Sequence, residues 1–278
     1  MDLNTVTALA RPRNRAELPP PEAGDAFVAG GTWLFSEPQR HLSRLVDLSG
    51  LDWIPLQADD TGLTLAATCT VATLDGFEAP AAWRAAPLIG QCCRAFLASF
   101  KIWNMATVGG NICMSLPAGP MTSLTAALEG TCHIWTADGG ARQVPVVEFV
   151  RGPLDNALQP GEVLRAITLP ARTLRRRAAF RRASLFPLGR SGVLLIGTHD
   201  TAAPEGAEAF TLTITASTVR PVQFTFPALP PAAELAACVA ALPDTLYYDD
   251  AHGRPDWRRH MTQMLAAEIH TELAEGRP

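Results

Sequence analysis

Two pairs of adjacent glycines are the positions in this 278-residue chain best suited to hold a ligand. The first pair lies in Val28-Ala29-Gly30-Gly31-Thr32-Trp33-Leu34 and the second in Ala106-Thr107-Val108-Gly109-Gly110-Asn111. Glycine tolerates positive φ and lets a ligand approach the backbone closely. Successive N–H groups that point the same way form an anion nest suited to a pyrophosphate, to which Thr32 and Thr107 would add hydroxyl donors. Each pair alone is more often an ordinary turn between a strand and a helix than a ligand site.

The motifs of other common chemistries are missing from the sequence. Neither GxGxxG nor GxxxxGK[ST] occurs, so neither a Rossmann site nor a P-loop is indicated. The segment Gly189-Arg190-Ser191-Gly192 has Val193 where a nucleophile elbow needs glycine. The six histidines form no HExxH motif and the six cysteines form no CxxC pair. We therefore expect no catalytic side chain, no zinc site and no iron–sulfur cluster in this chain.

Composition favours a folded protein without nucleic-acid or membrane partners. The chain has 23 Lys and Arg against 27 Asp and Glu, for a formal charge of −4, which gives no electrostatic reason to bind nucleic acid or an anionic membrane. No apolar run is long enough to span a bilayer, and the first 20 residues lack the apolar core of a signal peptide. A cytoplasmic location is expected, or a periplasmic one if a partner carries a twin-arginine signal.

The hydrophobic pattern predicts alternating strands and helices around the glycine segments, and then a simpler C-terminal third. A helix ends before the second glycine pair, a second helix follows it, and a hairpin comes next. Strands are predicted over 27–29, 45–48, 63–68, 132–136, 142–146, 162–169, 193–198, 210–216 and 222–226. Helices are predicted over 85–98, 121–129, 231–242 and 255–274, the last with Asp256 as its N-cap. A domain boundary is placed near residue 171.

The two glycine segments, about 75 residues apart and in this order, resemble those of the FAD-binding subunits of the xanthine dehydrogenase and carbon monoxide dehydrogenase family. In that family an AGGTDL-like loop and an A-T-x-G-G-N loop hold the FAD pyrophosphate. Three further stretches are similar to family motifs. They are Leu45-Val46-Asp47-Leu48, Pro117-Ala118-Gly119 with the helix that follows, and Leu158-Gln159-Pro160-Gly161-Glu162-Val163-Leu164. The resemblance covers residues 25 to 170 well and the C-terminal third mainly in pattern.

The resemblance implies a fold and a domain division. The expected fold is α+β, of the vanillyl-alcohol-oxidase or PCMH type, in which two α/β subdomains hold an extended FAD. A C-terminal domain of an antiparallel sheet with helices, like that of carbon monoxide dehydrogenase flavoproteins, would follow. The corresponding boundaries are 1–57 and 58–171 for the two FAD-binding subdomains and 172–278 for the C-terminal domain.

Carried over residue by residue, the resemblance also implies cofactor contacts. Residues 29–34 would surround the pyrophosphate and ribose after Val28, and the second segment would complete the cradle. Leu97 would lie near the flavin ring or its linker, and Leu164 near the adenine or the ring system. Arg181 stands where relatives often have a lysine near the pyrimidine edge of the flavin, and a cation there would stabilise the reduced flavin.

Three positions depart from the family pattern. Trp33 replaces an aspartate of the first loop, and Trp103 replaces a common arginine. Pro120 stands where the family has an aspartate that binds polar groups of FAD. Because proline offers neither a side-chain acceptor nor an N–H group, FAD binding is expected to be weaker or its geometry shifted.

The function implied by the resemblance is electron transfer within a multi-subunit molybdenum hydroxylase. A large molybdopterin subunit would oxidise the substrate, and a small subunit with [2Fe-2S] clusters would pass electrons to the FAD of this chain. The FAD would then reduce an external acceptor such as NAD⁺, a quinone or oxygen. Two alternatives remain open: an assembly subunit of the same fold that has lost tight FAD binding, and a free-standing flavin oxidase.

Overall fold

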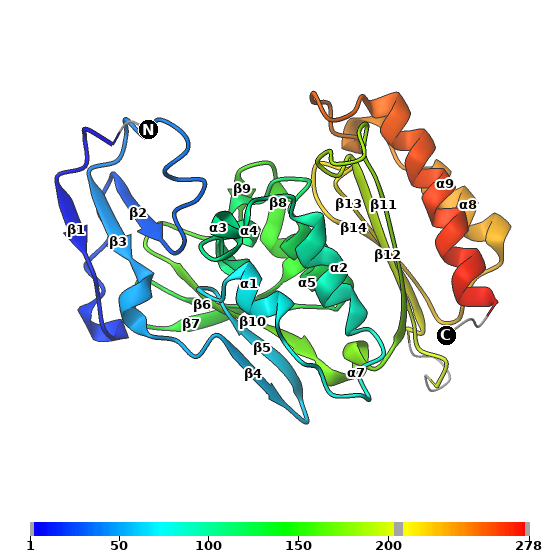
Figure 1. Cartoon of the computed structure of the whole chain (residues 1–278), viewed down its shortest axis with the longest axis horizontal. Coiled ribbons are helices and arrows are strands. Elements are labelled where there is room, and N and C mark those ends of the chain that lie inside the picture. The colour runs from blue at the N-terminus through cyan, green and yellow to red at the C-terminus, as the bar shows by residue number, and fades with distance from the viewer. Residues whose placement is uncertain (1–2, 203–207, 276–278) are drawn as a thin grey trace.

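Three sheets of three or more strands follow one another along the chain in the computed structural model, which describes residues 3–202 and 208–275 (Figure 1). The first is parallel, with strand order β1-β3-β2. Its strands are β1 (Ala8–Ala10), β2 (Asp25–Val28) and β3 (Arg44–Asp47). Leu45 and Val46 are buried in the middle strand, and Arg44 forms a two-pronged ion pair with Asp25 on the neighbouring strand. Strand β2 of this small sheet ends at Val28, two residues before the first glycine pair.

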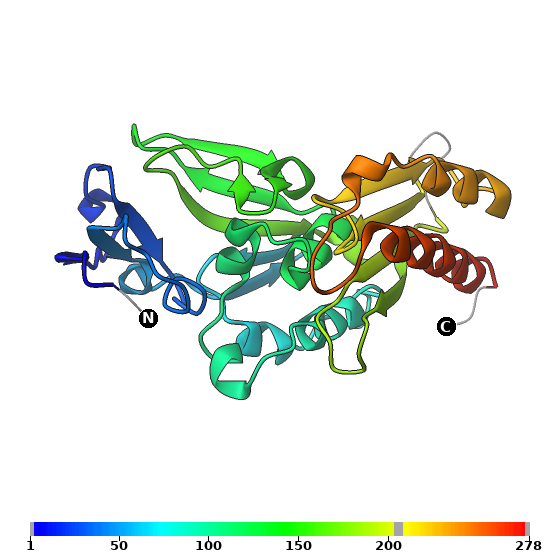
Figure 2. The ribbon, with the colours of Figure 1, turned by 90° about the horizontal axis from the view of Figure 1, so that it is seen from above.

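The second sheet is antiparallel, with strand order β4-β5-β10-β6-β7. Its strands are β4 (Leu56–Asp59), β5 (Gly62–Ala66), β6 (Thr131–Trp135), β7 (Ala141–Pro145) and β10 (Val163–Pro170). Side chains alternate between its two faces, so Leu65, Ile134 and Ile167 enter the largest hydrophobic core, whereas His133 and Thr168 lie on the opposite face. Helices cover only the core face, which leaves the other face open (Figure 2).

The helices of this central part connect β5 to β6 and pass through both the second glycine pair and the Pro117-Ala118-Gly119 motif. They are α1 (Val71–Asp75), α2 (Pro87–Ala95), α3 (Phe100–Trp103), α4 (Val108–Met114) and α5 (Pro120–Ala127). Short elements lie between β7 and β11: α6 (Val146–Phe149), β8 (Val150–Gly152), β9 (Asp155–Asn156) and α7 (Ala171–Leu174). The sequence pattern predicted no element over 99–119, because α3 and α4 are too short to show a helical period.

The third sheet is antiparallel, with order β11-β12-β13-β14, and two helices pack against it. Its elements are β11 (Arg177–Ala183), β12 (Val193–His199), β13 (Phe210–Thr215), β14 (Val222–Phe226), α8 (Ala232–Ala240) and α9 (Pro255–Ala274). Helix α5 contacts β12 and β13 on one face, and α9 contacts β11 and β12 on the other. The predicted N-cap Asp256 is wrong, because Arg254 is the N-cap and Pro255 occupies the first helical position.

The domain division into 1–57, 58–171 and 172–278 remains a proposal. Each of the three sheets falls within one of these parts, except that β4 already begins at Leu56. Ser123 of α5 shares a 2.7 Å hydrogen bond with Thr215 of β13. Gln223 of β14 donates to the carbonyl of Ala126. The third sheet is therefore attached to the central part through buried polar contacts as well as apolar ones.

Candidate cofactor site

The first glycine pair opens a single helical turn with unused backbone donors. Gly31 has φ +66°, which favours glycine, and its carbonyl accepts a hydrogen bond from the N–H of Phe35. Over the described residues, the backbone N–H groups of Thr32, Trp33 and Leu34 have no acceptor. These three groups begin a helical turn, so they point in a common direction and carry partial positive charge. They form the kind of nest that a phosphate group requires.

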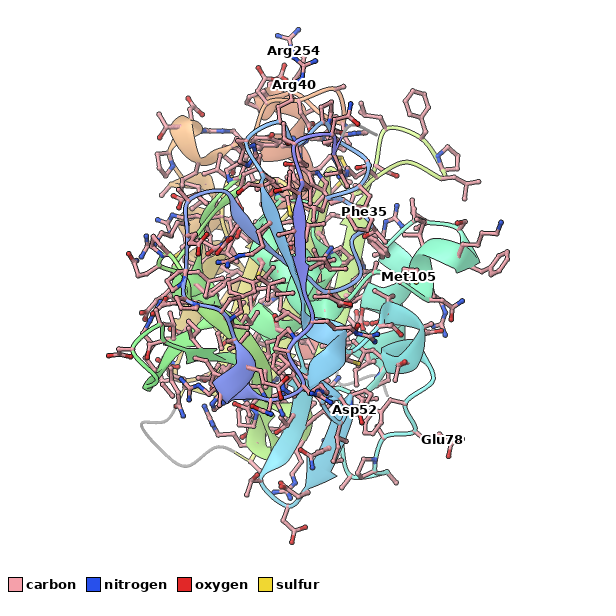
Figure 3. The ribbon with its side chains drawn as sticks, turned by 90° about the vertical axis from the view of Figure 1, so that its left-hand side faces the viewer. Phe35, Arg40, Asp52, Glu78, Met105 and Arg254 are labelled. Atoms are coloured by element: carbon pink, nitrogen blue, oxygen red, sulfur yellow. The ribbon has the colours of Figure 1, made fainter. Side chains whose placement is uncertain are left out.

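The two glycine segments meet in space, although 71 residues (35–105) lie between them in the sequence. A Cβ atom on residue 30 would lie only 1.7 Å from the carbonyl oxygen of Met105, one residue before the second segment begins. Figure 3 shows Met105 and Phe35, the residue that closes the turn of the first loop, on the same side of the molecule. The close approach is possible because Gly30 has no side chain. The convergence that the sequence suggested is thus present in the structure.

The second glycine segment differs from the prediction in how its amides are used. The N–H of Val108 donates to the carbonyl of Cys69, and the N–H of Gly109 donates to the carbonyl of Ala67. Thr107 caps α4, since its Oγ1 accepts from the N–H of Gly110. These groups already have protein acceptors, so the segment does not present a row of free amides. What it offers a ligand is the remaining Thr107 hydroxyl proton and a backbone that can be approached closely at Gly110.

Glycine at position 109 serves the packing of α4 on the sheet. A Cβ there would lie 2.5 Å from the Cβ of Ala67, which follows β5. At position 110 a Cβ would meet only the Oγ1 of Thr107, at 2.9 Å. The first glycine is therefore required by the fold and the second by the N-cap. Ala106 is buried behind them and accepts a hydrogen bond from the N–H of Val71.

Asn111 and Pro120 lie next to each other. The Oδ1 of Asn111 accepts a hydrogen bond from the N–H of Met121 at 3.1 Å, and it thereby caps α5, where Pro120 is the first residue. Pro120 is buried, and it provides no acceptor for a ligand. The nearby Oγ1 of Thr122 is buried and has no partner among the described residues. Thr122, which the sequence did not single out, is thus an unassigned hydroxyl beside the position of the family aspartate.

Leu97 lies in a largely apolar hollow of about 480 Å³. The wall is formed by the segment between α2 and α3, together with Leu188 from the loop after β11, and it includes Phe96 and Trp103. The indole N–H of Trp103 donates to the carbonyl of Phe96 at 2.9 Å and fixes this segment. A flat, apolar hollow of this kind suits an aromatic ring of a cofactor. Trp103, a departure from the family pattern, has a clear structural role here.

Leu164 is 3% exposed and belongs to the central core on β10, beside Ile134 of β6. Because the Leu164 side chain is buried among other core residues, little of it is accessible to a cofactor. Its predicted contact with the adenine or the ring system therefore stays a proposal.

The predicted role of Arg181 is not supported by its position. Its Nε lies 2.8 Å from Glu268 and its Nη1 lies 2.7 Å from Glu272, both on α9. Side chains alternate along β11, so residues 179, 181 and 183 face α8 and α9. Both carboxylates hold the pKa of Arg181 above its usual value despite its partial burial. Arg181 thus stabilises the C-terminal domain and points away from the glycine segments.

Arg182 is the arginine of β11 on the side of the central part. Its neighbour Phe180 packs on the central core, and residues two apart on a strand share a face. The Nη2 of Arg182 donates to the carbonyl of Gly189 at 2.8 Å, beside Leu188 of the hollow. No carboxylate pairs with it over residues 3–202 and 208–275. In the sequence, the large apolar Phe180 beside the small Ala179 indicates which face of β11 packs on the central part, and Arg182 is on the same face as Phe180.

The site has no metal-binding character of its own. In the part of the chain that the structure describes, no three His, Cys, Asp or Glu side chains gather as ligands. Burial raises the pKa of the Cys69 thiol to about 12 and also raises that of Cys113, so both are neutral thiols near neutral pH. Likewise, no helix of the described chain is long and apolar enough to cross a bilayer.

Comparison with known proteins decides the family. Residues 15–172, more than half of the chain, match the model described as FAD binding domain in molybdopterin dehydrogenase. The chain belongs to this family of FAD-binding domains. In the curated set, the medium chain of carbon monoxide dehydrogenase from Afipia carboxidovorans is 31% identical over 147 residues, or 51% of this chain and 50% of that one. The sequence match thus spans only half of the length of that relative.

Two solved structures share the fold over nearly the whole chain. Quinoline 2-oxidoreductase from Pseudomonas putida 86 matches with a TM-score of 0.79 and 20% identity, covering 99% of each chain. Reconstituted CO dehydrogenase from Oligotropha carboxidovorans matches with a TM-score of 0.80 and 21% identity, covering 98% of each chain. The PCMH-type fold predicted from the sequence is confirmed, and the C-terminal third shares it despite its weaker sequence resemblance.

The residues present fit an FAD. The Thr32–Leu34 turn has free amides that would suit a phosphate, Gly30 and Gly110 leave the backbone open, and the hollow at Leu97 has room for a ring. Two residues after Pro120, the buried hydroxyl of Thr122 has no partner among the described residues. The cofactor assignment of this domain therefore rests on the chemistry of its own residues as well as on the family.

Proposed function

We propose that this chain is the electron-transfer subunit of a molybdenum hydroxylase, with partners that hold [2Fe-2S] clusters and molybdopterin. The observation that carries the proposal is the convergence of the two glycine segments of an FAD-binding domain, Gly30 against Met105. A relative is named a medium chain of carbon monoxide dehydrogenase, which supports a complex that also has a larger and a smaller subunit.

The residues of this chain would bind and orient the cofactor. The free amides of Thr32, Trp33 and Leu34 would neutralise the pyrophosphate, and the Thr107 hydroxyl would donate to the same group. The segment held by Trp103 would cover one ring, and Arg182 would add positive charge near the hollow. When bound, FAD would supply the redox chemistry, accepting electrons from a cluster and passing them to an external acceptor. No side chain of this chain needs to act as a general acid or base.

The test uses the full-length chain alone and together with co-expressed partner subunits. We expect the lone chain to bind FAD but to oxidise no purine, aldehyde or aromatic heterocycle. The assembled complex should transfer electrons from its substrate to an artificial dye acceptor. Turnover of any of these substrates by the lone chain would contradict the proposal and favour a free-standing flavin oxidase.

A second candidate function is an assembly subunit with weak FAD binding, which the buried Pro120 favours. Its signature is a complex that forms and turns over substrate with an artificial acceptor while its visible spectrum lacks flavin. The electron-transfer function instead requires about one FAD per chain in the purified complex. The same absorption spectrum therefore separates the two candidates.

A further inference from the structure

The open face of the second sheet contains a hollow of about 450 Å³ that the cofactor site does not include. Its residues come from β5, β6, β7 and β10. Most of their side chains lie on the face opposite the helices, whereas Ile134 and its cross-strand partner Arg142 point to the core face. A volume of this size is in the range of small-molecule pockets. Its lining includes His133, Ala141, Arg142, Arg165, Ala166 and Thr168.

A bulge in β10 places Arg165 on this open face. The register between β10 and β6 shifts between Leu164 and Ala166, so Arg165 has no partner residue on β6. Regular alternation from Ile167 would have put residue 165 into the core. Because of the bulge, Leu164 takes the core position instead, and Arg165 lies with Ala166 in the hollow. Bulges commonly redirect a side chain in this manner.

Arg165 is held in place but lacks an anionic partner. Its guanidinium lies 4.4 Å from the ring centroid of Trp53 and 5.9 Å from that of Trp135. Among the residues that the structure describes, no oxygen atom accepts a hydrogen bond from the guanidinium of Arg165. Burial alone lowers the pKa of Arg165, as expected of a cation that no carboxylate stabilises. Its planar N–H fork is pre-oriented and unused.

The neighbouring groups leave this positive charge uncompensated. The charge of Arg142 is already neutralised, because its guanidinium forms a two-pronged ion pair with the carboxylate of Glu162. The Nε2 of His133 is 2.9 Å from the Oγ1 of Thr168, and burial followed by the charge of Arg165 lowers the pKa of His133. His133 is thus neutral at pH 7 and offers hydrogen bonding without charge. Ala141 and Ala166 form an apolar part of the wall.

We propose that this hollow binds a small organic carboxylate, whose anionic group meets the N–H fork of Arg165 and whose apolar body lies over Ala141 and Ala166. A carboxylate matches the spacing of the guanidinium fork, and the pair is strengthened by partial removal from water. Because the hollow has one unpaired cation beside an apolar wall, we expect it to prefer a carboxylate that is attached to a hydrocarbon group. The site is independent of the electron-transfer function, since it lies on the face of the sheet opposite α4 and α5.

Calorimetric titration of the full-length chain with benzoate, and with the uncharged benzamide as matched probe, tests the proposal. Benzoate is expected to bind saturably at one site and benzamide at least about tenfold more weakly, since a charge-assisted contact contributes about 1.5–3 kcal/mol. Arg165→Met should weaken benzoate binding by about ten- to a hundredfold. Arg84→Met, which removes an exposed arginine elsewhere, should leave it unchanged.

Ala141→Trp provides a second variant that keeps the cation and fills the hollow from its exposed rim. It should also abolish saturable benzoate binding, and it decides the outcome if Arg165→Met does not fold. Equal binding of benzoate and benzamide, or wild-type binding by the variants, overturns the proposal. So does an absence of benzoate binding, and if Arg165→Met then weakens association with a partner subunit, the hollow is a protein contact instead.

Discussion

Replacing Gly30 by alanine tests whether the meeting of the two glycine segments is needed for FAD binding. The added Cβ would lie 1.7 Å from the Met105 carbonyl oxygen, whereas real Cβ contacts shorter than 3.0 Å are essentially never seen. The loops must therefore part by at least 1.3 Å (3.0 − 1.7). Overpacking of this kind typically costs about 1–3 kcal/mol. Because both loops contact the cofactor in the proposed site, we expect most of that cost as lost FAD affinity, about ten- to a hundredfold.

The assay for this variant is FAD titration of the flavin-free full-length chain, followed by quenching of flavin fluorescence. Gly152→Ala is the matched control, since no atom lies within 4 Å of the Cβ it adds. The control should bind FAD like the unaltered chain. If Gly30→Ala also bound FAD with unaltered affinity and the same melting temperature, the two segments would not converge on the cofactor and the reasoning would be refuted.

Four further predictions follow from the site and its surroundings. Arg182→Met should lower the flavin midpoint potential, whereas Arg181→Met should cost at most about 1 kcal/mol of stability and leave the potential unchanged, because its ion pairs with Glu268 and Glu272 are partly exposed. The reverse result in a potentiometric titration would restore Arg181 as the flavin cation. Trp103→Phe, which removes the hydrogen bond to the Phe96 carbonyl, should weaken FAD binding by up to about tenfold; unchanged affinity in the same titration would show that this segment does not cover the cofactor. Pro120→Asp should destabilise the flavin-free chain, because it buries a carboxylate, and should enlarge the rise in melting temperature on adding FAD; a smaller rise would mean that position 120 does not face the cofactor. Burial raises the pKa of Cys69 and Cys93 to about 12 from an ordinary value near 9, so the unfolded chain loses these protons first and stability should fall as pH rises from 9 towards 12; urea unfolding at pH 8 and pH 10 measures this, and equal stability would contradict the burial of these thiols.

Most strands and the long helices could be predicted from the sequence because their side-chain periods are clear, whereas the short edge strands β1 and β4 were not predicted. The strand predicted over 132–136 is β6 at Thr131–Trp135, one residue earlier, and it alternates between core and open face, and the helix over 255–274 has the bounds that its apolar stripe indicated. Elements α3 and α4 could not be predicted, because four and seven residues do not establish a period. What fixes them is tertiary: the carbonyls of Ala67 and Cys69 accept the first amides of α4.

The candidate site could be predicted at the level of segments and less well at the level of atoms. Glycine pairs indicated close backbone approach, and Gly30 shows it, but the sequence could not tell that the amides of Val108 and Gly109 donate to the central sheet region. Arg181 faces α9 and Arg182 faces the central part, because neighbouring residues on a strand lie on opposite faces, and the motif alone did not tell them apart. A motif therefore predicts which segments lie near the site, whereas the alternation of side chains along a strand decides which residue of the segment faces it.

The most direct test of the account is the flavin content of the purified full-length chain, measured from visible absorption and from FAD released on denaturation. The account predicts about one FAD per chain, with Gly30→Ala markedly depleted and Gly152→Ala unaffected. A colourless preparation that fails to take up added FAD, alone and with its partner subunits, would contradict the claim that the two glycine segments form a cofactor site.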